Sequence, residues 1–160
     1  MSKSFKFCPH CGNSLMLGIV DAHEKLICSA SCGFLYWKNP APVVAVLIKM
    51  NGKYVLVKRS KDEGVGKWCM PCGFVNEGES LADAACRETL EETHLVITVP
   101  ELPFKIVNLA AINEHLHFFK GTIVGGTLEA GDDAEEADCF ATDALPEMAF
   151  GTHTEILLAA

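Results

Sequence analysis

The chain has 160 residues, of which 49% are hydrophobic and 21% charged, and its formal net charge is −8. These values are typical of a globular protein and exclude an intrinsically disordered chain. The acidic balance argues against non-specific nucleic-acid binding by the whole molecule. No apolar run is long enough to span a bilayer, and the first residues contain no apolar signal core, so we expect a cytoplasmic protein.

Two close cysteine pairs lie near the N-terminus, at Cys8, Cys11, Cys28 and Cys32. Four thiolates in this pattern suit tetrahedral Zn²⁺, and the segment between the pairs can form a hairpin. Two disulfides or four free thiols are the alternatives, but disulfides are unexpected without a secretory signal. We therefore predict a structural zinc ribbon over residues 1–38, followed by a second domain over residues 39–160.

The second domain begins with two apolar runs, residues 43–50 and 53–58, which are typical of buried strands. Asn51–Gly52 between them is a two-residue hairpin signal. The basic segment Lys-Arg-Ser-Lys at 58–61 is either a solvated loop or a contact for a phosphate or a base. Later strands are expected over 95–99, 104–112, 115–124 and 139–141, and a terminal helix over 152–159.

A short helix carrying three glutamates is expected after Ser80, which can cap it with Asp83 three residues on. At about 100° per residue, one helix face carries Leu81, Ala84, Ala85, Glu88, Glu91 and Glu92. The opposite side is predicted to pack on the core and carries Ala82, Cys86, Thr89 and Leu90. Carboxylates at this spacing repel one another, so either the face is simply solvated or it binds a cation such as Mg²⁺ or Mn²⁺.

The stretch from residue 73 to 95 resembles the Nudix box. That pattern reads Gly, five residues, Glu, seven residues, Arg-Glu, an apolar residue, any residue, Glu-Glu, any residue, Gly and an apolar residue. Seven positions match: Gly73, Glu79, Arg87, Glu88, Glu91, Glu92 and Leu95. Thr89 departs at an apolar position and His94 replaces the final Gly. We expect His94 to end the helix, because His tolerates positive φ better than most residues.

The resemblance implies an α+β fold, a Nudix α/β/α sandwich with a mixed sheet, preceded by the small zinc-ribbon module. It implies that Mg²⁺ or Mn²⁺ is held mainly by Glu88 and Glu92, with Glu91 sharing and the Gly73 carbonyl completing the site. Arg87 would hold a helix carboxylate in place, and Glu79 would brace the loop.

The general base is expected either in the helix set, which includes Glu91, or at Glu136, with Asp133 as the next choice. The last two lie in the acidic segment 129–136, which we expect to be a loop. Cys69 and Cys72 form a C-x-x-C. We favour a coincidence of the motif over a redox or metal role, because the four earlier Cys complete a zinc set. His153 is expected to be structural.

The implied reaction is hydrolysis of the pyrophosphate bond in a nucleoside diphosphate linked to another moiety. The ribbon and the segment Asp-Ala-Leu-Pro at 143–146 are similar to the FAD/ADP-ribose pyrophosphatase and NADH pyrophosphatase-like groups. ADP-ribose or FAD ranks ahead of NADH, because a Ser-Gln-Pro-Trp element is missing. The alternative is a catalytically silent Nudix domain that senses a nucleotide metabolite. The expected partner is a small-molecule nucleotide, and a homodimer is the default because many Nudix enzymes dimerise.

Overall fold

The computed structural model describes residues 5–131 and 134–160. The chain divides into two compact units, Met1–Pro40 and Ala41–Ala160. Within the described residues, no helix combines the length and apolar character needed to cross a membrane.

The N-terminal unit contains a small antiparallel sheet in the order β1-β2-β3. Its strands are β1 (Leu15–Val20), β2 (His23–Cys28) and β3 (Leu35–Tyr36). Asp21 and Ala22 join β1 to β2 with positive φ angles of 51° and 63°, which closes the predicted hairpin. β2 ends on Cys28, so the strand positions one of the four clustered cysteines.

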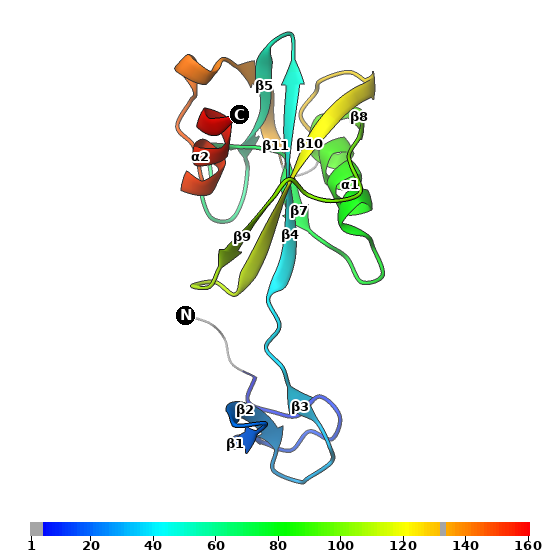
Figure 1. The fold of residues 1–160 in the computed structure, drawn as a ribbon, viewed down its shortest axis with the longest axis vertical. Helices are drawn as coiled ribbons and strands as arrows, with labels where there is room; N and C mark the ends of the chain where they lie inside the picture. Colours follow the sequence, from blue (N-terminus) through cyan, green and yellow to red (C-terminus); the bar gives the residue numbers. More distant parts are fainter. Residues whose placement is uncertain (1–4, 132–133) are drawn as a thin grey trace. The chain divides into compact units, whose positions relative to one another are not determined.

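The C-terminal unit is built on a mixed sheet, which has eight strands in the part of the chain described (Figure 1). The main order is β11-β5-β4-β10-β8, and β6, β7 and β9 pair with β5, β4 and β10. β10 runs parallel to β4, whereas the other pairs are antiparallel. The strands are β4 (Ala41–Met50), β5 (Lys53–Arg59), β6 (Trp68–Cys69), β7 (Cys72–Phe74), β8 (Leu95–Thr98), β9 (Lys105–Leu109), β10 (Glu114–Gly126) and β11 (Ala134–Phe140).

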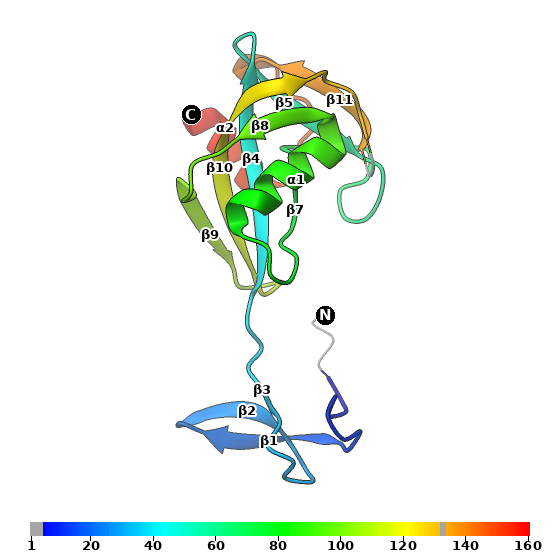
Figure 2. The same cartoon turned by 90° about the vertical axis from the view of Figure 1, so that its right-hand side faces the viewer.

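Two helices cover the two faces of this sheet, α1 (Leu81–Thr93) on one side and α2 (Gly151–Ala159) on the other (Figures 1 and 2). A single 3₁₀ turn, η1 (Thr142–Ala144), precedes α2 in the described chain. Alternate residues of β4 enter two separate cores. Val44, Val46 and Ile48 pack on the α1 side, and Ala45 and Leu47 pack on the α2 side. Burial on both faces explains the continuous apolar run of β4, and the predicted α/β/α sandwich is confirmed.

The turn between β4 and β5 follows from its sequence. Asn51 and Gly52 have φ angles of 52° and 78°. Two consecutive positive φ angles match the twist of a two-residue hairpin, and Asn-Gly is the pair that adopts them most readily. The end of helix α1 at His94 is likewise explained by its local sequence. His94 has φ 56° and ψ 12°, and its backbone N–H donates to the Leu90 carbonyl.

The predicted core face of α1 is wrong in part. Thr89 is buried as expected, but Leu90 is 46% exposed, whereas Ala84 and Ala85 are fully buried. The glutamate-bearing face is therefore the inward face of the helix. Its first turns place alanines against the sheet, and its last turns carry Glu88 and Glu92 on the same inward side. Tertiary packing overrides the apolar pattern here, and a single exposed leucine is common on the surface of a folded protein.

The acidic segment 129–136 was predicted to be a loop, and this is wrong for its last residues. β11 begins at Ala134 and pairs antiparallel with β5, so Glu136 lies on a strand at the edge of the sheet. The expected strand over 104–112 is also shorter, because β9 ends at Leu109 and a turn precedes β10.

Candidate active site

A cavity of about 600 Å³ lies in the C-terminal unit, beside the last turns of α1. This volume falls in the range usual for small-molecule sites. The acidic side chains Glu88 and Glu92 border it together with Gly73 of β7. Basic side chains border it as well, at Lys58, Arg59 and Lys61. The cavity therefore offers both carboxylates that could hold a cation and positive charges that could hold phosphate oxygens.

Glu92 is the more deeply buried of the two carboxylates, with 9% of its surface exposed. Its Oε2 accepts a hydrogen bond from the Cys72 backbone N–H at 3.0 Å. Burial, above all, raises the pKa of Glu92 to about 9, and the neighbouring Cys69 adds to the shift. Burial also raises the pKa of Glu88. Two carboxylates held in a cleft against their preference for water form a site that a cation would stabilise.

Arg87 connects the helix to the loop before it. Its guanidinium donates two hydrogen bonds to the Glu79 carboxylate, of 2.7 and 2.8 Å, in the bidentate geometry typical of arginine–carboxylate pairs. It also donates to Glu88 at 2.6 Å, to Glu91 at 3.0 Å and to the Phe74 carbonyl at 2.9 Å. These hydrogen bonds place Arg87 between the carboxylates and Glu79 on the loop. The hydrogen bond from Arg87 lowers the pKa of Glu79 to about 2.

Gly73 is needed for Glu88 to occupy its position. A Cβ atom built on Gly73 would overlap the carboxylate of Glu88, which fills the space where a side chain would lie. Gly73 pairs with Val44 of the central strand, so its backbone cannot easily move aside. The missing side chain leaves the carboxylate in direct contact with the β7 backbone.

The donor set fits Mg²⁺ or Mn²⁺. Both ions prefer carboxylate and carbonyl oxygens, and they keep positions open for water and phosphate. Glu88 and Glu92 would hold such an ion at the cavity, with the Gly73 carbonyl beside them. Glu91 is more exposed, at 43%, and its carboxylate bonds Arg87 rather than bordering the cavity.

The structure does not bring Glu136 to this cavity. Its side chain is 55% exposed, and its carboxylate pairs with the Lys58 ammonium group at 2.7 Å. Lys58 does border the cavity, so Glu136 is ion-paired to a cavity residue without bordering the cavity itself. Asp133, the other expected base in this segment, lies outside the described residues.

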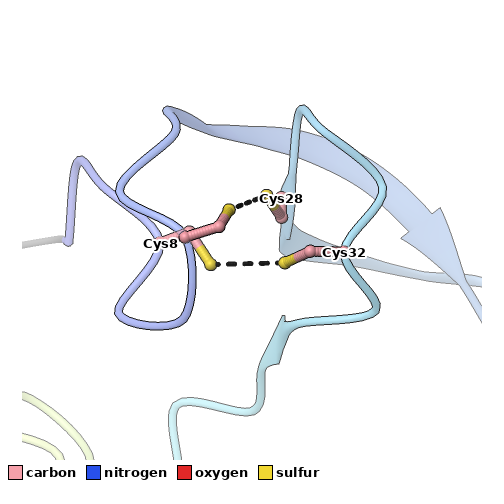
Figure 3. A group of neighbouring side chains, drawn as sticks. Cys8, Cys28 and Cys32 are labelled. Carbon is pink, nitrogen blue, oxygen red and sulfur yellow. Dashed lines mark hydrogen bonds between the residues drawn. The ribbon is translucent and has the colours of Figure 1, made fainter.

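Four cysteine sulfurs gather in the N-terminal unit, all within 4.8 Å of one another. Cys8 Sγ faces Cys32 Sγ at 3.5 Å (Figure 3), and Cys11 Sγ lies 3.4 Å from Cys28 Sγ. Tetrahedral Zn–S bonds of about 2.3 Å would place sulfurs about 3.8 Å apart, which these separations approach. The His10 backbone N–H also points at Cys8 Sγ, 3.4 Å away, as suits a thiolate. The four thiols thus fit a zinc ion.

Two further residues at the cavity, Arg59 and His153, were not among the site residues predicted from sequence. His153 was expected to be structural, and Arg59 was one of three basic residues in the segment 58–61, for which two interpretations were open. The Arg59 guanidinium stacks on the ring of Phe150 at 5.1 Å, and its Nε donates to the Glu63 carbonyl. No local pattern around His153 signals a site, because the chain segments that meet it are remote in sequence.

The inward carboxylates, the glycine under Glu88 and the sandwich around them define a Nudix hydrolase, and the chain belongs to the Nudix family: the NUDIX domain pattern matches residues 38–157. It is 35% identical over 123 residues to an ADP-ribose pyrophosphatase of Methanocaldococcus jannaschii, covering 74% of this chain and 72% of the relative. It is also 27% identical over 152 residues to the NAD-capped RNA hydrolase NudC of Edwardsiella ictaluri, covering 91% of this chain and 55% of the relative.

Solved structures show the same fold. A NUDIX hydrolase from Nitrosomonas europaea superposes with a TM-score of 0.87 at 27% identity, covering 96% of this chain and 88% of that one. An ADP-ribose pyrophosphatase from Streptococcus suis superposes with a TM-score of 0.60 at 19% identity, covering 76% and 91%, which shows the fold alone. The chain spans about half the length of the NudC relative.

Proposed function

We propose that this protein hydrolyses the pyrophosphate bond of a nucleoside diphosphate linked to another moiety, with ADP-ribose or FAD ahead of NADH. The observation that carries the proposal is the cavity bordered by both Glu88 and Glu92 and by Lys58, Arg59 and Lys61. The ADP-ribose pyrophosphatase of M. jannaschii supports ADP-ribose, because this chain covers 72% of it. The NudC relatives support an NAD-type substrate as the next candidate.

In this reaction the oxygen of a water molecule bonds to one phosphorus as the bridging P–O bond breaks. ADP-ribose would yield AMP and ribose 5-phosphate. A bound Mg²⁺ or Mn²⁺ would neutralise charge that develops on the phosphoryl oxygens and favour ionisation of the water. Arg87 would keep Glu88 and Glu91 in place, and Glu79 would fix Arg87. Arg59 and its neighbouring lysines would bind the diphosphate.

We propose Glu91 or Glu136 as the general base. Neither carboxylate is among the residues that border the cavity, so each would have to act through a water or after a side-chain movement. Glu91 needs the smaller change, because it shares Arg87 with the cavity residue Glu88. The zinc ribbon, a cytoplasmic location and a homodimer also stay proposals.

A substrate panel tests the proposed function. Purified protein with Mg²⁺ is expected to cleave ADP-ribose or FAD faster than NADH, and faster than nucleoside triphosphates, with the products identified by chromatography. Cleavage of triphosphates alone would contradict the proposal. Tight nucleotide binding without turnover would instead favour the sensor, which fits the fact that neither candidate base, Glu91 or Glu136, borders the cavity.

Replacing Gly73 with alanine is expected to lower kcat/KM about 100-fold, because the new Cβ displaces the Glu88 carboxylate and misplacement by about 1 Å has effects of this size. Gly151→Ala is the matched control, since a Cβ there meets no atom within 4 Å and the backbone is not strained. The control should keep full activity and lose no stability. Equal activity of the two variants would show that Glu88 is not held as described.

A further inference from the structure

His153 is buried in the C-terminal unit and yet borders the cavity. It lies on α2 with 1% of its surface exposed. The rings of Phe118 and Phe150 meet it edge to face, with centroids 5.7 and 5.1 Å away. Packing between two aromatic rings fixes the orientation of the imidazole.

One ring nitrogen of His153 is an acceptor. The Met70 backbone N–H donates to Nδ1 at 3.2 Å, so Nδ1 carries no proton. Burial, followed by the positive charge of Arg59, lowers the pKa of His153 to about 3. The imidazole is therefore neutral at physiological pH, and its single proton resides on Nε2.

The Nε2–H group is left for a ligand. Among the residues that the structure describes, His153 makes its one hydrogen bond through Nδ1. In the same residues, every fully buried side-chain nitrogen or oxygen has a hydrogen-bond partner. Nε2 has no such partner, so it is not fully buried. We place its exposed surface at the cavity that His153 borders. An oriented donor of this kind is costly to leave unpaired once a ligand excludes water.

We propose that His153 is a specificity-determining residue whose Nε2–H donates a hydrogen bond to a neutral acceptor of the nucleobase, either a ring nitrogen or a carbonyl oxygen. The diphosphate already has three cationic side chains at the cavity, Lys58, Arg59 and Lys61, so an uncharged donor is better matched to an uncharged acceptor. Apolar side chains that could contact a flat base border the same cavity, among them Leu109, Leu116 and Phe150.

The inference rests on the proposed function only for its substrate class, and direct binding can test it separately. In ¹⁵N-labelled protein, the His153 ring resonances should show the Nε2–H tautomer. Adding AMP should shift them, whereas ribose 5-phosphate, which lacks a base, should not. An equal shift with both compounds, or no shift with millimolar AMP, would overturn the inference. A shift with AMP in a protein that cleaves no substrate of the panel would uphold it while the proposed function fails.

Two variants separate the donor from the packing role. His153→Asn keeps an acceptor near the Met70 N–H but cannot reach the cavity, and His153→Gln extends an amide donor toward the Nε2 position. We expect His153→Asn to raise KM for ADP-ribose about tenfold with little change in kcat, because one neutral hydrogen bond has an effect of this size. His153→Gln should bring KM most of the way back to the parent value. Glu155→Gln, an exposed change on the same helix, is the control. Unchanged KM in a folded His153→Asn protein would refute the role.

Discussion

Replacing Glu92 with glutamine is expected to reduce kcat about 100- to 1,000-fold while leaving the fold intact, because the variant lacks the anionic oxygen that would hold the catalytic cation. The glutamine oxygen can still accept the hydrogen bond from the Cys72 N–H, so the local backbone is preserved. Glu77→Gln, the same charge change at an exposed loop position, should retain activity. Steady-state assays with Mg²⁺ would measure both. Retained activity in Glu92→Gln would remove the basis of the metal proposal.

The same substitution should stabilise the metal-free protein at alkaline pH. The folded-state pKa of Glu92, about 9, exceeds its ordinary value of 4.5. Below pH 4.5 the Glu92 carboxyl is protonated in both the folded and the unfolded protein, and its contribution to the free energy of unfolding is then fully present. As the pH rises from 4.5 toward 9, the carboxyl ionises in the unfolded chain but not in the folded protein, so this stabilising contribution is lost.

We therefore expect metal-free Glu92→Gln to exceed the parent protein in free energy of unfolding at pH 8 by a few kcal/mol, with a small difference at pH 5. Urea unfolding at the two pH values would measure it. Added Mg²⁺ should stabilise the parent protein and not the variant. A pH-independent difference would mean that Glu92 does not titrate in this way.

Removing zinc should unfold the N-terminal unit and leave the C-terminal unit folded. The four clustered thiols belong to a unit with small strands and many exposed apolar side chains, including Phe7 and Leu17. A unit of this kind depends on its metal, and structural zinc contributes about 10–16 kcal/mol in comparable sites. We expect one zinc per chain by elemental analysis, and cleavage within residues 1–40 by limited proteolysis after chelation.

Cys8→Ser is expected to lose the zinc, whereas Cys139→Ser, which changes a thiol packed in the C-terminal unit, should keep it. Thiol titration of the parent protein separates zinc from the alternatives, because zinc-bound thiols become reactive on chelation and disulfides do not. A parent protein purified without zinc, with eight freely reactive thiols, would show that the cluster is not a metal site.

Features set by local chemistry could be predicted from sequence. The Asn51–Gly52 hairpin, the Ser80 cap and the helix end at His94 each depend on a few neighbouring residues. Features set by remote contacts could not. The inward face of α1 depends on the space between helix and sheet, and the position of Glu136 depends on pairing between β11 and β5. His153 becomes a cavity residue only when α2 packs beside residues more than 80 positions earlier, such as Met70.

The pairing of β4 with β10 has a consequence for synthesis of the protein. Ala41 of β4 pairs with Glu114 of β10, so the central strand β4 is translated long before this partner strand. Until then the nascent chain carries an apolar strand with one open edge, a surface prone to aggregation, and such distant pairing slows folding. Fragments that stop before residue 114 are thus expected to be insoluble, and any shortened form of this enzyme must retain β10.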